Sequence, residues 1–493
     1  MICITIAQTS RTLALADMLN AVTLGADLIE IRLDTLEKSP HLKDMMEAKR
    51  VPILFSCRRL QDGGNWKGTE EERLILLRQA VLSSAEYVEI EMDIADQIRP
   101  FPGCKRVISY TNLQETPKNL DKIYQEMLAL KPDIIKLTCR ARTPDEAWPL
   151  IQILVKPPVP TTVVGLGKAG IMLSILGKKI HSLWTVAALE RGMEAYPGQP
   201  TIQDLQNIYA YGDIGKSTRF TGVTGLGERD WLLTGLLNEG FRKVGVHHRV
   251  LPIQIGSPGM FRKTIDAVRL QSVVIDPSNY GSMHQIGQYD SASKYPVQAS
   301  DFLLPEEDHW KASNLIGKTI TNSLLRLIKH KEPDLEKPLQ DRVVLFAGNG
   351  PLTRMAAREI KQQGAHLMFA GKDREEALRL SQVFGGRMLP WEAIYQTSHD
   401  ILFYSPESLS EPEEDEMPIH PGYLRHGMYV LDLSNSPRMS RLLKEAMLRT
   451  CSFLHPVSFL VEYACTIIQE TTGKQPDYQE LMTKCQEWFM EEE

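Results

Sequence analysis

Asp133-Ile134-Ile135-Lys136-Leu137-Thr138-Cys139 is a short apolar run with a single lysine inside it. A run of this length and composition predicts a buried strand. A lysine in such a strand is costly to bury unless it is neutral, paired or reactive. A desolvated lysine loses its proton more readily, and the free amine can attack a carbonyl carbon to form a Schiff base. The alternative is an edge-strand lysine whose ammonium group reaches water.

Further runs of the same kind surround this one in the first 215 residues, and helical patterns separate most of them. The predicted strands are 2–7, 27–34, 52–58, 86–93, 106–111, 133–139, 161–167 and 182–189. Eight strands that alternate with helices over this length favour a (β/α)8 barrel. In barrels of this kind the active site lies at the C-terminal ends of the strands.

Charged and polar side chains gather towards those strand ends. Glu30, Arg32 and Asp34 alternate along the second predicted strand, so we expect them to share one face. The others are Arg58 after the third strand, Glu89, Glu91 and Asp93 along the fourth, and Gln199 after the eighth. An arginine can bind a carboxylate through two parallel hydrogen bonds. An amine among such groups predicts a site for an anionic keto substrate, although a structural network of ion pairs accounts for the same charges.

The composition bounds the class of protein. The chain has 493 residues, enough for two or three domains, and a net charge of -6, which argues against a nucleic-acid-binding surface. Seven scattered cysteines without a CxxC pair predict reduced thiols and no metal site. The sequence opens on a predicted strand and holds no apolar run long enough to span a membrane. We therefore expect a cytoplasmic protein without nucleic-acid or membrane partners; a homodimer is one of the oligomeric states left open.

Two further α/β units are predicted after the barrel, at 219–330 and 338–480. The second opens with a buried strand, the turn Gly348-Asn349-Gly350 and a helix that contains Arg354. A glycine turn between a strand and a helix N-terminus is typical of a Rossmann-type domain that binds dinucleotides. We take these four residues as candidate cofactor-binding residues, together with Lys372, which follows the next strand, where a 2′-phosphate would lie.

Residues 1–215 resemble the type I 3-dehydroquinate dehydratases. The matching pieces, in the family's order, are Glu30-Ile31-Arg32-Leu33-Asp34, Ser56-Cys57-Arg58, Val88-Glu89-Ile90-Glu91, Val107-Ile108-Ser109-Tyr110, Asp133-Ile134-Ile135-Lys136 and Pro197-Gly198-Gln199. The resemblance implies that Lys136 forms an imine with the ketone of 3-dehydroquinate and that Glu91 supports the site. It implies a substrate-binding set of Glu30, Arg32, Asp34, Arg58 and Gln199, and no cofactor for the lyase. The imine acts as an electron sink, so that a proton and then water can leave.

Two positions depart from the pattern of that family. Thr111 stands where the family has a histidine that acts as general acid and base, a role typically worth about 10²–10⁴-fold in rate. Ser174 stands where the family has an arginine that holds the substrate carboxylate, with Lys168 nearby. His181, before the eighth predicted strand, is the imidazole to examine as a substitute.

Residues 219–480 resemble shikimate dehydrogenases, as in fused bifunctional enzymes, through Thr221-Gly222-Val223-Thr224-Gly225 and the glycine turn. The resemblance makes NADP a candidate cofactor of this part. The family's substrate-binding serines fall at Trp231 and Leu233, its catalytic lysine falls in the run that ends at Ser278, and its partner aspartate falls near Thr321. Without the lysine and the aspartate, no group is in place to move the proton that accompanies hydride transfer.

Three functional hypotheses follow. The first is a Schiff-base lyase of the dehydratase family that carries an inactive dehydrogenase-like module. The second is a non-catalytic protein that binds a metabolite or NADP. The third is a lysine-imine enzyme that acts on a different keto substrate. The retained charges around Lys136 favour imine chemistry.

Overall fold

Parallel strands and helices alternate along the first part of the computed structural model, which describes residues 1–289, 295, 297–406, 419–433 and 437–490. The chain divides into two units: unit 1 is Met1–Thr218 with Leu251–Val268, and unit 2 is Arg219–Val250 with Arg269–Glu493. We describe each unit by itself.

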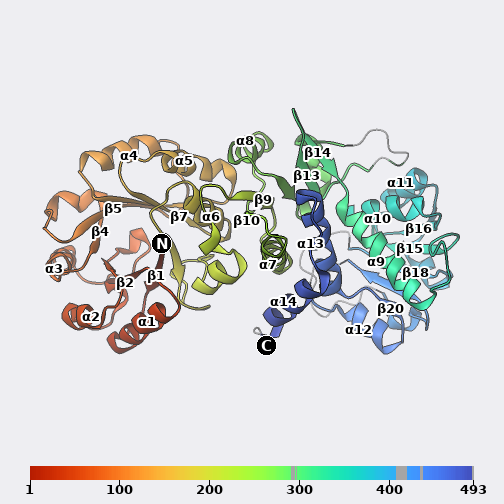
Figure 1. Cartoon of the computed structure of the whole chain (residues 1–493), viewed down its shortest axis with the longest axis horizontal. Coiled ribbons are helices and arrows are strands. Elements are labelled where there is room, and N and C mark those ends of the chain that lie inside the picture. The colour runs from red at the N-terminus through yellow and green to blue at the C-terminus, as the bar shows by residue number, and fades with distance from the viewer. Residues whose placement is uncertain (290–294, 296, 407–418, 434–436, 491–493) are drawn as a thin grey trace. The chain divides into compact units, whose positions relative to one another are not determined.

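Unit 1 is the predicted barrel. Its strands are β1 (Ile2–Ile6), β2 (Leu28–Arg32), β3 (Ile53–Ser56), β4 (Tyr87–Glu91), β5 (Lys105–Asn112), β6 (Ile134–Arg140), β7 (Thr161–Leu166) and β8 (Thr185–Ala188), in the order β7-β6-β5-β4-β3-β2-β1-β8. The helices between them are α1 (Arg11–Thr23), α2 (Leu42–Ala48), α3 (Glu70–Leu82), α4 (Leu120–Ala129), α5 (Pro144–Val155) and α6 (Ile171–Lys179), and they lie outside the strands (Figure 1). The fold class predicted from the sequence is confirmed.

The barrel is nearly closed, because hydrogen bonds join β7 to the residues that immediately precede β8. The backbone N–H of Leu183 donates to the carbonyl of Thr161 at 2.9 Å. The hydroxyl of Thr162 donates to the carbonyl of Trp184 at 2.7 Å.

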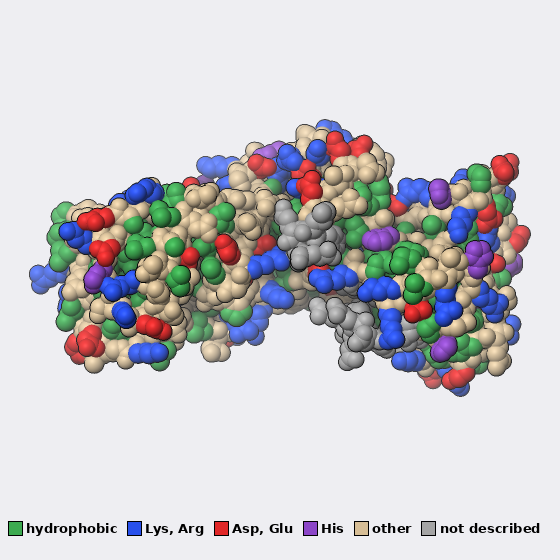
Figure 2. Space-filling model, turned by 90° about the horizontal axis from the view of Figure 1, so that it is seen from below, with side chains coloured by type: hydrophobic (Ala, Val, Ile, Leu, Met, Phe, Trp, Pro, Cys, Tyr) green, Lys and Arg blue, Asp and Glu red, His purple; other side chains and the backbone are tan. Residues whose placement is uncertain are grey.

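The barrel interior is built in layers, because alternate residues of each strand point inward. One layer is apolar and consists of Cys3, Leu28, Leu54, Val107, Ile134, Val164, Trp184 and Val186. Two residues further along their strands, Thr5, Glu30 and Lys136 follow Cys3, Leu28 and Ile134 on the same face. The polar layer therefore lies towards the C-terminal ends of the strands, on that side of the apolar layer. On the outer face of unit 1 shown in Figure 2, basic and acidic side chains are interspersed.

Unit 2 contains two sheets among its described residues. A mixed sheet has the order β10-β9-β11-β13-β14-β12, from β9 (Arg219–Val223), β10 (His248–Pro252), β11 (Ser272–Val274), β12 (Gly287–Tyr289), β13 (Phe302–Pro305) and β14 (Trp310–Ser313). The helices of this part are α7 (Glu228–Lys243) and α9 (Leu315–Lys331), and α13 (Pro456–Thr472) packs against both of them. The short helix α8 (Pro258–Val268) belongs to unit 1.

The second sheet of unit 2 is parallel. Its order β17-β16-β15-β18-β19-β20 is formed by β15 (Val343–Ala347), β16 (His366–Ala370), β17 (Arg387–Leu389), β18 (Ile401–Tyr404), β19 (Tyr429–Asp432) and β20 (Ser452–Phe453). The order corresponds to 3-2-1-4-5-6, that of the Rossmann fold. Its helices are α10 (Pro351–Gln362), α11 (Arg374–Phe384) and α12 (Arg441–Leu448), and α14 (Tyr478–Met490) follows α13. No described helix is both long and apolar enough to cross a bilayer. The predicted boundaries at 219–330 and 338–480 stay predictions.

His248 on β10 is a buried histidine of unit 2. Its ring stacks on Phe241 with the ring centres 4.4 Å apart, and Nε2 lies 2.8 Å from the Thr221 hydroxyl. Burial lowers the pKa of His248 to about 4 from its usual 6.5. A lowered folded-state pKa means that its contribution to stability is present above pH 6.5 and is lost as the pH falls towards 4.

We therefore expect the wild-type chain to lose about 3 kcal/mol more free energy of unfolding than His248→Gln between pH 7 and pH 4. Urea unfolding of unit 2 at both pH values measures the difference. The exposed His284 gives a control, since His284→Gln should follow the wild type. Equal losses in wild type and His248→Gln would contradict the prediction.

Candidate active site in the barrel

Lys136 lies inside the barrel on β6 and is only 1% exposed. Its Nζ donates a hydrogen bond to Oε2 of Glu89 at 2.7 Å and lies 3.6 Å from Oε2 of Glu30. The sequence left open a lysine that reaches water; the structure instead places the amine between two carboxylates. A buried charge is tolerated when it is paired in this way.

Arg58 completes a cluster of four charges. Its Nη2 donates to Oε1 of Glu30 at 2.6 Å and to Oε2 of Glu89 at 3.2 Å. Two acidic and two basic side chains therefore share one buried cluster. The Nε of Arg58 is buried and has no hydrogen-bond partner among the described residues. That N–H is a donor left over for a ligand, because an unsatisfied buried donor is costly.

Glu30 is held as a carboxylate. It accepts hydrogen bonds from the hydroxyls of Ser56 at 2.8 Å and Thr5 at 3.2 Å, besides the one from Arg58. Burial would raise its pKa, but the charges of Arg58, Lys136 and Arg32 outweigh burial and hold the pKa of Glu30 well below its usual range. This carboxylate is therefore a fixed anion and a poor acceptor of protons.

Gln199 joins the cluster through Thr5. Its Nε2 lies 3.4 Å from the Thr5 hydroxyl, and its Oε1 accepts the backbone N–H of Ala195 at 2.7 Å. The loop is held close by Gly198, which has φ +83°, and a Cβ there would lie 2.4 Å from the backbone nitrogen of Lys168. Only glycine suits this position, so the loop places Gln199 over β1.

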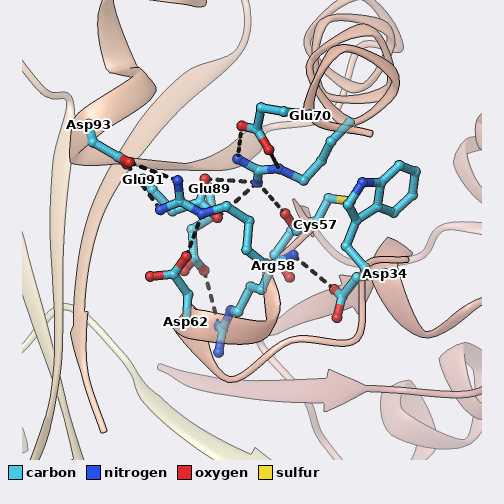
Figure 3. A network of polar contacts seen from close by, with 12 residues as sticks. Asp34, Cys57, Arg58, Asp62, Glu70, Glu89, Glu91 and Asp93 are labelled. Atoms are coloured by element: carbon cyan, nitrogen blue, oxygen red, sulfur yellow. Dashed lines mark hydrogen bonds and ion pairs between the residues drawn. The ribbon is translucent and has the colours of Figure 1, made fainter. Parts of the chain in front are cut away.

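Arg32 and Asp34 form a separate buried pair, with Nη2 and Oδ2 2.7 Å apart. The prediction that Asp34 shares the strand with Glu30 is wrong, since β2 ends at Arg32 and Asp34 lies in the 3-10 turn Leu33–Thr35. Asp34 also accepts the backbone N–H of Arg58 at 3.1 Å (Figure 3). The pair therefore positions the loop that carries Arg58, rather than contacting Lys136.

Glu91 is bound by Arg73 from α3, not by Lys136. Figure 3 shows Glu70, Glu91 and the Cys57 carbonyl around one guanidinium group, that of Arg73, which is fully buried. Both carboxylate oxygens of Glu91 lie 2.9 Å from Nη1. Burial raises the pKa of Glu91. The expected role of Glu91 in supporting the site stays a prediction, and the carboxylate that contacts Lys136 is that of Glu89.

The structure shows where the two residues that depart from the dehydratase pattern lie. Thr111 lies on β5, where it pairs with Thr138 of β6, one inward position beyond the pair Ser109–Lys136. Ser174 is half-buried in α6. His181 is exposed and precedes β8, so it lies at the N-terminal end of the strand, away from the polar layer. It does not replace the missing imidazole.

The glycine turn of unit 2 is tightly packed. Gly348 has φ +101°, and a Cβ there would lie 1.7 Å from the carbonyl oxygen of Ser405. Asn349 donates from Nδ2 to the Asp373 carbonyl at 2.8 Å. Arg354 is bound to Glu376 at 2.9 Å through Nε. Gly350 caps α10, and the other candidate residue, Lys372, is exposed after β16.

The residues at the positions expected for the dehydrogenase catalytic groups, Ser278 and Thr321, make other contacts. Ser278 hydrogen-bonds to Asp276, which also accepts from Thr224 at 2.6 Å. The hydroxyl of Thr321 donates to the Gly317 carbonyl one helical turn back in α9, at 2.9 Å. Neither residue can transfer a proton near neutral pH.

Comparison with known proteins matches both parts of the chain. Residues 2–216 match the family model "Type I 3-dehydroquinase". The chloroplastic bifunctional 3-dehydroquinate dehydratase/shikimate dehydrogenase of Arabidopsis thaliana is 28% identical over 447 residues, covering 86% of this chain and 74% of that protein. The 3-dehydroquinate dehydratase of Methanopyrus kandleri is 30% identical over 195 residues, 38% of this chain and 89% of the relative.

Two solved structures are also similar to this chain. The dehydroquinate dehydratase and shikimate dehydrogenase from S. pombe is 17% identical and covers 98% of each chain, with a TM-score of 0.44. A Thermus thermophilus shikimate 5-dehydrogenase in complex with NADP(H) and shikimate is 16% identical, with a TM-score of 0.47, and covers 55% of this chain and 99% of its own.

Proposed function

Because the chain belongs to the type I 3-dehydroquinase family, we propose that its barrel converts 3-dehydroquinate to 3-dehydroshikimate through an imine on Lys136. The observation that carries the proposal is the buried Lys136 amine, held 2.7 Å from Glu89 and 3.6 Å from Glu30 in the polar layer. A ligand that enters from the C-terminal ends of the strands meets this layer first.

The chemistry follows from the positions of these groups. The uncharged amine of Lys136 attacks the ketone carbon, and loss of water gives an iminium that withdraws electrons from the neighbouring carbon. Arg58 supplies the unpaired Nε–H for an oxygen of the anionic substrate, and Glu30 fixes the orientation of Arg58. Gln199 and Thr5 add polar groups beside Glu30.

A direct assay tests this function. The full chain is incubated with 3-dehydroquinate, and the absorbance of the conjugated enone product is followed over time. The proposal predicts product above the enzyme-free control. If no product forms but the chain forms an imine with another keto acid, the result would instead favour the hypothesis of a different substrate.

We propose further that unit 2 is a dehydrogenase-like module without NADP-dependent activity. The residues at its glycine turn do not fit the cofactor. Pro351 begins α10 and lacks an N–H for a pyrophosphate. Arg354 is neutralised by Glu376, and Asp373 caps α11 where a 2′-phosphate would lie. Carboxylates at that place repel a phosphate.

Calorimetric titration of the full chain with NADPH should therefore give no binding heat. The titration is repeated with Glu376→Gln, which releases Arg354 while leaving Pro351 in place, and it should still give none. Saturable heat with the wild-type chain would contradict the prediction and favour the hypothesis of an NADP-binding protein.

A further inference from the structure

The proposed dehydration needs a group that takes a proton from carbon and returns it to the leaving hydroxyl, and Thr111 cannot do so. A threonine hydroxyl does not titrate in the neutral range. The two histidines of unit 1, His41 and His181, are both exposed. The carboxylates that lie nearest to the Lys136 amine are those of its own cluster, Glu89 and Glu30.

Glu89 and Glu30 are the carboxylates of that cluster, and they differ in their partners. Glu30 accepts three hydrogen bonds from neutral and charged donors and is fixed as an anion. Glu89 receives both of its hydrogen bonds, from Lys136 and Arg58, at Oε2 alone. Among the described residues no hydrogen bond reaches its Oε1. The side chain of Glu89 is 4% exposed, so that free oxygen lies in a site from which water is largely excluded.

We propose that Glu89 is the proton-transferring catalytic residue of the barrel, in the role that the missing histidine has in the family. The inference rests on the proposed dehydration. It is carried by the 2.7 Å contact between Glu89 and Lys136 and by the free second oxygen. The carbon that loses its proton lies two bonds from Nζ once the imine has formed, within reach of a carboxylate already bonded to Nζ.

The steps balance without a further reactant. The uncharged Nζ of Lys136 forms a bond to the ketone carbon and passes one N–H proton to the ketone oxygen, which takes a second proton from solvent water and leaves as water to give the iminium. Glu89 takes a proton from the adjacent carbon, and the C–H electrons form the enamine double bond and neutralise the nitrogen. The enamine then restores the iminium as the C–O bond of the hydroxyl breaks, and the proton on Glu89 leaves with it as water. Addition of water to the iminium releases the enone and the uncharged lysine amine, and it returns to solvent the proton that was taken up when the imine formed.

Glu89→Gln tests this role, because it keeps the shape and removes the base. We expect the rate of product formation to fall by about 10²–10⁴-fold. Borohydride trapping of the imine on Lys136 should persist, since loss of the neighbouring negative charge favours the uncharged amine that attacks. Exchange of the substrate's carbon-bound proton in heavy water, measured by NMR on recovered substrate, should be lost. The exposed Glu71 on α3 gives the control variant Glu71→Gln, expected to behave as the wild type.

Two results would overturn the inference. One is turnover by Glu89→Gln within about tenfold of the wild type, below the smallest loss expected of a general base. The other is a loss of imine trapping in the same proportion as turnover, which would make Glu89 a positioning residue for Lys136. Glu89→Asp, which keeps a carboxylate, should recover part of the exchange and excludes misfolding as the cause. If the wild-type chain forms no product, the proposed dehydration itself is refuted. The wild-type chain is therefore assayed before any variant is compared with it.

Discussion

Lys136→Met should reduce formation of 3-dehydroshikimate by roughly 10⁴-fold or more, as removal of a covalent nucleophile does in other enzymes. The methionine fills a similar volume but cannot form an imine, and no other lysine contacts Glu30 or Glu89 among the described residues. Initial rates of enone formation measure the effect.

Lys105→Met gives the matched control for that substitution. Lys105 is exposed at the start of β5, at the opposite end of the barrel strands, so its loss should leave the rate unchanged. Residual turnover by Lys136→Met within about a hundredfold of the wild type would show that the lysine is not the nucleophile.

Arg73→Ala should lower the free energy of unfolding of the barrel by about 3–5 kcal/mol, the usual cost of breaking a buried ion pair by removing one partner. Arg73 is fully buried and bridges Glu70, Glu91 and the Cys57 carbonyl. Its removal leaves the buried carboxylate of Glu91 without the cation that hydrogen-bonds to it.

Urea unfolding measures this loss, and the same helix supplies a control. Arg78 on α3 is exposed, so Arg78→Ala should change the free energy of unfolding by less than about 1 kcal/mol. A loss of similar size for both arginines would contradict a structural role specific to the network of Arg73 and Glu91.

The barrel could be predicted because its pattern of an apolar strand followed by a helix is repeated along the sequence. Eight apolar runs spaced by helical patterns leave few architectures open, and inward alternation then places Lys136 and Glu30 in one polar layer. Arg58 and Gln199 could be predicted from their positions after strand ends, where barrel sites lie. The short, partly polar strands β12 to β14 of unit 2 gave no comparable repeat and were not predicted.

The choice between Glu89 and Glu91 could not be made from the sequence. Both face inward on β4, and the hydrogen-bonded row in fact joins Glu91, Ser109 and Lys136. Strands in a barrel tilt against its axis, so residues in one row lie at different heights, and the neighbour of Lys136 comes from the row below. The partner of Glu91, Arg73, lies on a helix and could not be assigned by strand alternation. A cytoplasmic location and a homodimer stay predictions.

Borohydride trapping tests the central claim, a covalent imine on Lys136, most directly. The full chain is incubated with 3-dehydroquinate, reduced with borohydride, and its intact mass and peptide masses are measured. We predict one added substrate as a reduced secondary amine, located on the peptide that contains Lys136 and absent from Lys136→Met. No added mass, or an adduct that persists in Lys136→Met, would contradict the claim.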